Sequence, residues 1–184
     1  MFKSLFFILT LLSVQTIASP SARETQDWIN SKLLKYSDDT SIYADSGADY
    51  TWFQGDGPVI SFSECHMTTQ VELRKRSNGK SSYSYERHES FPLKEIKRIF
   101  YIRKDRETYT GYPRLVVEHN YNAGTRVNTH TRRGKTYRSA TSEMDIHFNY
   151  NNQESNLVNR LENAFLHLAK IARENPRCNE SEPF

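Results

Sequence analysis

The spacing of apolar residues changes along the chain, and each spacing predicts a different kind of element. Between residues 23 and 35 apolar side chains recur three or four positions apart, which predicts a short amphipathic helix. Ser21 and Glu24 stand in the S-x-x-E arrangement of a capping box, in which each side chain satisfies a free backbone donor of the other residue. The capping box therefore supports a helix N-terminus close to residue 23.

From Cys65 the apolar period becomes two, which is typical of a half-buried strand. Alternate residues from Cys65 to Leu73 share one face, and the intervening polar residues from His66 to Arg74 share the other. The pair Asn78-Gly79 then predicts a hairpin, because both residues tolerate the positive φ angles of its tight turn. The return strand carries Tyr83 and Tyr85.

Further short segments with strand character follow, and Phe91–Ile96 forms a corner before them. A polar loop is expected over residues 37–57, interrupted by a short aromatic strand. Together these segments predict six or seven strands at the spacing of a meander or small barrel. The strand candidates lie at residues 50–53, 98–104, 115–119, 126–132 and 144–150, with a basic turn at 132–135.

The last regular element has helical spacing again. Leu157, Leu161, Phe165 and Leu168 mark one apolar stripe, and Pro176 ends a helix of roughly 18 residues. A run of strands closed by one amphipathic helix predicts an antiparallel α+β domain. In that fold an N-terminal helix precedes a curled sheet, and the C-terminal helix closes an open end of the sheet.

This layout resembles a group of exported proteins that contain a pleckstrin-homology-like barrel. The resemblance covers about residues 22–173 and rests on the first helix with Trp28-Ile29, the Phe91–Ile96 corner and the closing Arg160–Leu168 helix. It implies a barrel closed by the last helix and assigns no catalytic residue. Intracellular relatives that bind phosphoinositides use basic residues around the first hairpin, where this chain has Arg74, Lys75, Arg76, Lys80 and Arg87. Export would separate the protein from that lipid.

The first 18 residues have the composition of a secretory signal peptide. Lys3 supplies the positive charge, an apolar run follows from Leu5 to Val14, and small residues lead to Ala18. The run is too short to cross a bilayer, which takes about 20 residues. We expect residues 1–18 to be a signal, an uncleaved anchor being the alternative. Residues 19–184 are then one exported domain, periplasmic or secreted, with no membrane span after removal of the signal.

Only two cysteines are present, Cys65 and Cys178. In an oxidising compartment an even pair is most simply one disulfide, which we expect here. The alternative is a nucleophilic Cys65 with His66 as its base. Adjacent residues on a strand point to opposite faces, so His66 is poorly placed for that role.

The chain has a formal net charge of +3, but its charges are segregated. Residues 36–73 contain seven acidic residues and no Lys or Arg, whereas residues 74–138 contain 17 basic and 6 acidic residues. Such a basic segment could bind an anionic envelope surface, or the two segments could neutralise each other in the fold. Secretion argues against nucleic acid as a partner. The candidate anion-binding residues are Arg74, Lys75, Arg76, Arg132, Arg133 and Lys135.

Candidate chemistry is sparse. Asp145 and His147 alternate on one predicted strand and His130 lies on the preceding one, so these three side chains could hold a metal if the strands pair. The alternative is a solvated outer face, and alternation with the apolar residues between them favours it. No nucleophile elbow, zinc-protease helix or phosphate-binding loop occurs.

These observations favour a non-enzymatic binding or interaction module without a cofactor. Its partner would be an envelope protein or an anionic surface. A hydrolase that uses the His/Asp strand face is the alternative.

Overall fold

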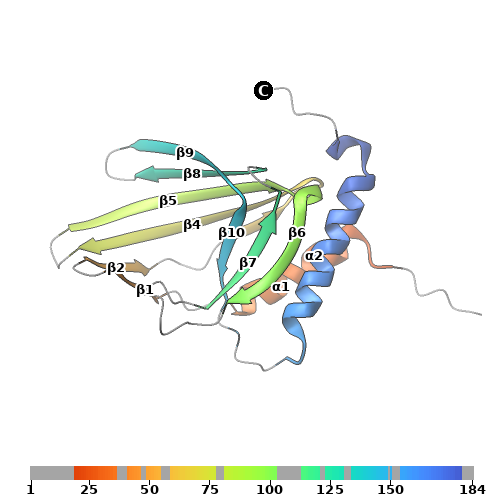
Figure 1. The fold of residues 1–184 in the computed structure, drawn as a ribbon, viewed down its shortest axis with the longest axis horizontal. Helices are drawn as coiled ribbons and strands as arrows, with labels where there is room; N and C mark the ends of the chain where they lie inside the picture. Colours follow the sequence, from red (N-terminus) through yellow and green to blue (C-terminus); the bar gives the residue numbers. More distant parts are fainter. Residues whose placement is uncertain are drawn as a thin grey trace, which may run out of the picture.

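The computed structural model describes residues 19–36, 41–46, 49–54, 59–77, 81–102, 113–120, 123–130, 134–148, 150 and 154–179. Within these residues the fold is α+β, as predicted, with two α-helices and three antiparallel sheets (Figure 1). The predicted signal at residues 1–18 lies outside the described residues.

The largest sheet has five strands in the order β3-β4-β5-β8-β9. Its centre is the long hairpin of β4 and β5, paired from His66 opposite Pro92 to Ser77 opposite Ser81. This pairing confirms the predicted hairpin, although Asn78-Gly79 lies outside the described residues. The strands are β3 (Val59–Phe62), β4 (His66–Ser77), β5 (Ser81–Pro92), β8 (Gly124–His130) and β9 (Lys135–Thr141).

A three-stranded sheet crosses one end of the large sheet, in the order β10-β7-β6 (Figure 1). The 3-10 helix η1 (Leu93–Glu95) turns the chain from β5 into β6, and Ser142 alone separates β9 from β10. The strands are β6 (Ile96–Ile102), β7 (Arg114–His119) and β10 (Glu143–His147). A separate hairpin of β1 (Ser41–Ser46) and β2 (Asp49–Gln54) lies beside β4.

The sheets are not closed into a barrel, and the expected single sheet of six or seven strands is wrong. The described residues form ten strands, and three of these, β1, β3 and β9, were not predicted. The reason is clearest in β9, where six of seven residues are exposed, so no apolar alternation marks the strand. The chain also passes between the two larger sheets three times: from β5 to β6, from β7 to β8 and, at Ser142, from β9 to β10.

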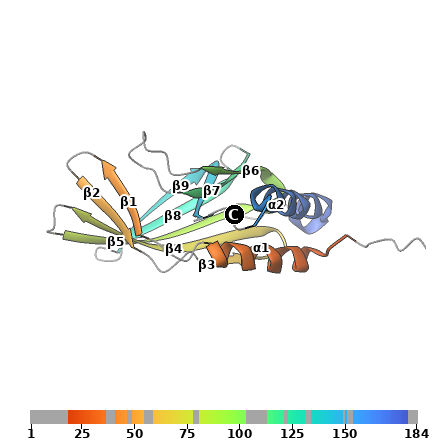
Figure 2. The ribbon, with the colours of Figure 1, turned by 90° about the horizontal axis from the view of Figure 1, so that it is seen from below.

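Both helices lie at one end of the large sheet (Figure 2). Helix α1 (Ala22–Tyr36) begins with the predicted capping box: the Ser21 amide donates to Glu24 Oε2 at 2.8 Å, and the Glu24 amide donates to Ser21 Oγ at 3.2 Å. Helix α2 (Leu157–Glu174) has the predicted length of 18 residues. Neither described helix combines the length and the apolar composition needed to cross a membrane.

The apolar stripe of α2 packs onto the three-stranded sheet and the η1 corner. Its fully buried residues contact β6 and belong to one core cluster with buried residues of β7 and β10, and Tyr36 of α1 packs against Phe148 at a ring distance of 5.4 Å. Burial of these side chains holds the helices to the sheets, because each buried Leu or Phe contributes about 1.5–3 kcal/mol of transfer free energy. The buried α2 residues are Leu157, Leu161, Phe165, Leu168, Ala169 and Ala172.

The C-terminal end of α2 contacts the η1 corner, and the segment after it contacts Cys65. We call this set of contacts the C-terminal clamp. Arg173 donates to the carbonyl oxygens of Lys94 and Ile96, each at 2.8 Å. Beyond α2, the 3-10 helix η2 (Pro176–Cys178) brings Cys178 back to Cys65, with the sulfur atoms 2.06 Å apart and the Cα atoms 5.2 Å apart. The expected pair therefore lies at disulfide distance in the fold.

Candidate functional site: a groove on the outer face of the large sheet

The two faces of the five-stranded sheet have different surroundings. Met67 and Phe91 lie on the inner face, where they are buried in the core. The residues next to them in the sequence point the other way, toward solvent. We call this second side the outer face; Thr68, Gln70, His88 and Ser90 lie on it.

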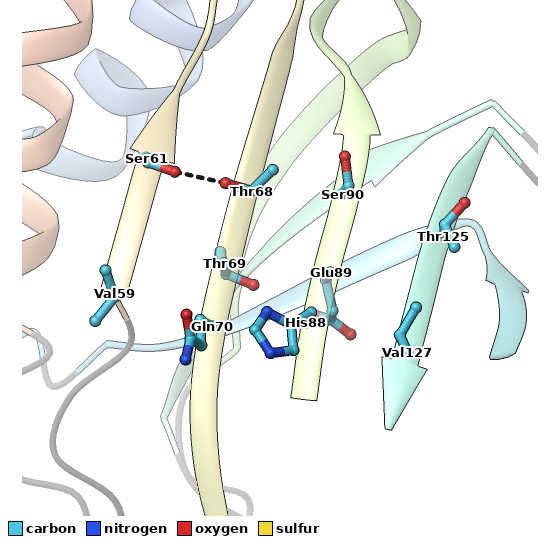
Figure 3. Close-up of a pocket in the computed structure, with 10 residues that line it drawn as sticks. All are labelled: Val59, Ser61, Thr68, Thr69, Gln70, His88, Glu89, Ser90, Thr125 and Val127. Carbon is cyan, nitrogen blue, oxygen red and sulfur yellow. Dashed lines mark hydrogen bonds between the residues drawn. The ribbon is translucent and has the colours of Figure 1, made fainter. Parts of the chain in front are cut away.

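An open groove of about 260 Å³ crosses the outer face over β3, β4, β5 and β8 (Figure 3). This volume is just below the range of about 300–1,000 Å³ that is usual for small-molecule pockets. The lining side chains on the outer face are arranged in two rows that run across the strands. Each row contributes one residue from each of the four strands.

The first row consists of hydroxyl side chains, and we call it the hydroxyl row. Ser61 is opposite Thr68, Thr68 is opposite Ser90, and Ser90 is opposite Thr125. Ser61 Oγ and Thr68 Oγ1 share a hydrogen bond of 2.5 Å. Because neighbouring strands lie about 4.8 Å apart, the row presents four evenly spaced groups that can both donate and accept.

The second row places an amide and an imidazole between two valines: Val59, Gln70, His88 and Val127. Val59 is 65% exposed, so an apolar surface is open to solvent at one end of the groove. Glu86 lies beside this row, accepts a hydrogen bond from Gln70 Nε2, and has its Oε1 3.1 Å from His88 Nε2. The exposed carboxylate at the groove therefore has two partners already.

The charges beneath the groove face the opposite side of the sheet. Glu89 of β5 is only 4% exposed and pairs with Arg126, its register partner on β8. Burial raises the pKa of Glu89, and the Arg126 guanidinium partly opposes this shift. The sheet thus keeps the carboxylate of Glu89 in a buried ion pair, and no lysine or arginine lines the groove.

The anion-binding candidates fall at the ends of strands. Arg74, Lys75 and Arg76 belong to the last part of β4, although their side chains lie outside the described residues. Lys135 begins β9, and its Nζ lies 5.5 Å from the ring centroid of Tyr137. Strands β5 and β8 separate β4 from β9, and both basic segments lie at the end of the sheet that is distant from the helices (Figure 1). Arg132 and Arg133 lie outside the described residues.

The predicted convergence of His130, Asp145 and His147 required β8 and β10 to pair, and they do not. Strand β8 pairs with β5 and β9, whereas β10 pairs with β7 in the other sheet. The unpredicted strand β9 lies between them in the chain. Asp145 instead has Arg114 Nε at 3.5 Å. The described residues contain no group of three potential ligands for a metal, and the side chains of His130 and His147 are not among them.

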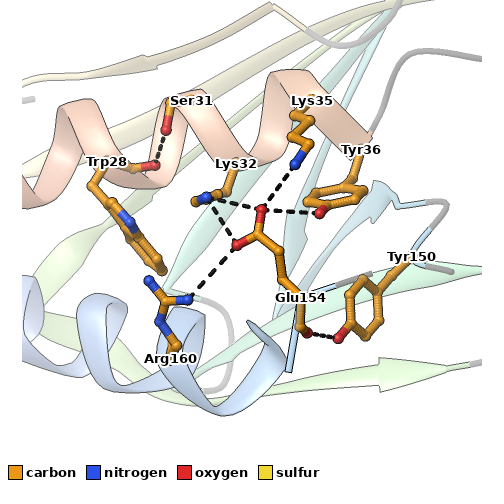
Figure 4. Close-up of polar contacts among 8 residues, drawn as sticks. All are labelled: Trp28, Ser31, Lys32, Lys35, Tyr36, Tyr150, Glu154 and Arg160. Carbon is orange, nitrogen blue, oxygen red and sulfur yellow. Dashed lines mark hydrogen bonds and ion pairs between the residues drawn. The ribbon is translucent and has the colours of Figure 1, made fainter. Parts of the chain in front are cut away.

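The carboxylate of Glu154 has a strongly lowered pKa and lies between the two helices (Figure 4). Glu154 accepts hydrogen bonds from Lys32 at 2.9 and 3.0 Å, from Lys35 at 2.9 Å and from the Tyr36 hydroxyl at 3.0 Å. These partners, Lys32 first among them, lower the pKa of Glu154 to about 2. The network connects α1 to the segment before α2, and it engages cations that could otherwise bind an external anion.

One histidine is buried at the corner where the two sheets meet. His119 is 1% exposed and stacks on Phe91 at a ring distance of 5.2 Å. Its Nδ1 lies 3.1 Å from the Asn120 carbonyl oxygen, and Nε2 has no hydrogen-bond partner among the described residues. Burial lowers the pKa of His119, which keeps the ring neutral.

The sequence pattern predicted a polar strand face that includes Thr68 and Gln70, but it did not predict the groove. On β5 the residues on both sides of the strand are polar, because the buried face carries Glu89 with its partner Arg126. The polar outer positions therefore had no apolar contrast to mark them. The missing information was the register, which places Ser90 beside Thr68 and Thr125.

Comparison of the chain with protein-family models, with curated proteins and with solved structures finds no match. The chemistry of the groove is therefore the basis for assigning a function.

Proposed function

We propose that this chain is an exported, non-enzymatic binding module whose ligand docks in the groove on the outer face. The observation that carries the proposal is the set of side chains in the groove. Hydroxyl, amide and imidazole groups stand in two regular rows, beside an exposed apolar residue, on a face that no described helix covers. Polar groups that orient a ligand next to apolar surface are typical of binding sites.

Export is the second part of the proposal. The signal-like composition of residues 1–18 supports it, and so does a cysteine pair at disulfide distance. We expect the mature chain to begin at Ser19. N-terminal sequencing of protein recovered from its native compartment tests this point, and an intact Met1 would contradict it.

A matched pair of variants tests the binding face. Thr125 and Thr136 are both exposed residues of the same sheet, but only Thr125 lines the groove. We expect Thr125→Arg to reduce sedimentation of the protein with the envelope fraction of its source at least tenfold. Thr136→Arg should leave sedimentation unchanged. Equal sedimentation of the two variants would place binding elsewhere, and no sedimentation of the unaltered protein would contradict an envelope-binding role.

A second candidate, hydrolysis, is favoured by one observation in the same groove. Glu86 Oε1 lies 3.1 Å from His88 Nε2, and a carboxylate that orients an imidazole is a common feature of nucleophilic catalysis. Turnover of chromogenic esters or glycosides that is lost in His88→Ala would favour this candidate. Turnover that persists in His88→Ala would exclude His88 as its base.

A further inference from the structure

Over three of its four strands, the groove can offer a ligand hydrogen bonds from side chains only. Strands β4, β5 and β8 are each paired on both sides, so their backbone N–H and C=O groups are used within the sheet. An extended peptide binds a sheet chiefly by adding backbone hydrogen bonds along a free edge, whereas the groove runs across the strands and reaches an edge only at β3. A ligand there must be recognised by hydroxyl, amide and imidazole groups.

The groove offers a ligand no free charge, because Glu89, which is among its lining residues, is only 4% exposed and is paired with Arg126. None of the side chains that line it is Lys or Arg. By strand alternation the Glu89 carboxylate points toward the inner face with Arg126, and the Glu86 carboxylate accepts a hydrogen bond from Gln70 and lies 3.1 Å from His88 Nε2. Arg138, opposite Val127 on β9, lies one strand beyond the lining residues. An anionic ligand would find no cationic side chain among the lining residues, and the carboxylates of Glu86 and Glu89 already have partners within the sheet.

Resting on the proposed function, we infer that the ligand is an uncharged carbohydrate chain that lies across the strands. Sugars carry hydroxyl groups that both donate and accept, as do Ser61, Thr68, Ser90 and Thr125. They also present apolar C–H surface, which Val59 and Val127 can contact. The groove is small for a binding pocket, so it covers only a short stretch of the chain, and we expect dissociation constants of about 1 mM for short oligomers.

Titration of the mature, oxidised protein with uncharged hexasaccharides of glucose and of N-acetylglucosamine tests this inference. We expect amide chemical-shift changes in ¹H–¹⁵N spectra to centre on Thr68, Ser90 and Thr125. Thr125→Arg should weaken binding at least tenfold and Thr136→Arg should not. Val59→Arg, at the opposite end of the groove, provides a second variant if Thr125→Arg misfolds by circular dichroism.

Three results would overturn the carbohydrate assignment: no shifts with any uncharged hexasaccharide, tighter binding of oligogalacturonate than of these probes, or shifts centred outside the groove. If envelope binding is nevertheless sensitive to Thr125→Arg, the groove remains a binding site and only the ligand class is wrong. If envelope binding is also insensitive, both the ligand class and the proposed function fail.

Discussion

Removal of the Cys65–Cys178 link should destabilise the fold substantially, because the link closes a long loop. The two residues are 113 positions apart. In the chain-entropy model a loop of that length restricts the unfolded chain by about 5 kcal/mol at 25 °C. The double variant Cys65→Ser/Cys178→Ser should therefore lose about that free energy of unfolding, which corresponds to a decrease in Tm of about 10–20 °C for a chain of this size.

The noncovalent part of the C-terminal clamp should keep the same fold in the variant. Arg173 still reaches Lys94 and Ile96, and Asn175 Nδ2 still donates to Glu64 Oε1 at 2.7 Å. Far-ultraviolet circular dichroism below the transition should consequently be unchanged, whereas the denaturant midpoint should fall.

Thermal and chemical unfolding with and without reductant measure the effect. The reductant should lower the stability of the unaltered protein to that of the double variant, and it should have no effect on the variant itself. A loss below about 1 kcal/mol would refute the loop-closure reasoning. Two free thiols in the folded, oxidised protein would show that the link does not form.

Three further perturbations test other parts of the fold. A Cβ at Gly124 would lie 2.7 Å from His119 Cε1, so Gly124→Ala should cost about 1–3 kcal/mol in chemical unfolding, and an unchanged midpoint would contradict the packing. The pKa of His119 is lowered from 6.5 in the folded state, so the free energy of unfolding should fall as pH decreases below 6.5. His119→Gln should reduce this pH dependence. An equal slope in the variant would assign the pH dependence to other groups. The pKa of Glu154 is lowered from 4.5 to about 2, so the contribution of Glu154 to the free energy of unfolding should be complete above pH 4.5 and lost as pH falls toward 2. Glu154→Gln should reduce the pH dependence of stability between these values. An unaltered acid profile would mean that the Lys32 contact contributes no stability.

The helices and the central hairpin could be predicted from the sequence because their patterns have strong contrast. The capping box fixed the start of α1, and the alternation from Cys65 to Leu73 identified the buried face of β4. Local patterns of this kind reflect which side of an element meets the core. They needed no knowledge of distant contacts.

The sheet order could not be predicted, because it depends on where the chain bends. Strands β8 and β10 were both recognised, but β9 between them has little buried surface and gave no signal. The bend at Ser142 then moved β10 into the other sheet, which separated His130 from Asp145. Buried polar residues had a similar effect on β5, where Glu89 hid the difference between the inner and outer faces.

No basic side chain lines the groove even though β5 and β8 belong to the most basic part of the chain. Residues 74–138 contain 17 basic and 6 acidic residues, yet Arg126 faces the inner side with Glu89, and Arg98 pairs with Glu118 on the other sheet. Binding in the groove should therefore rest on hydrogen bonds and apolar contact. Such binding changes little between 50 mM and 500 mM NaCl, whereas attraction between an anionic surface and exposed cations falls steeply as the Debye length shortens from roughly 14 Å to 4 Å. A salt titration of envelope binding thus separates the two hypotheses: a nearly constant affinity that is sensitive to Thr125→Arg supports the groove. A steep loss that is insensitive to this substitution would assign binding to the basic strand ends of β4 and β9 instead.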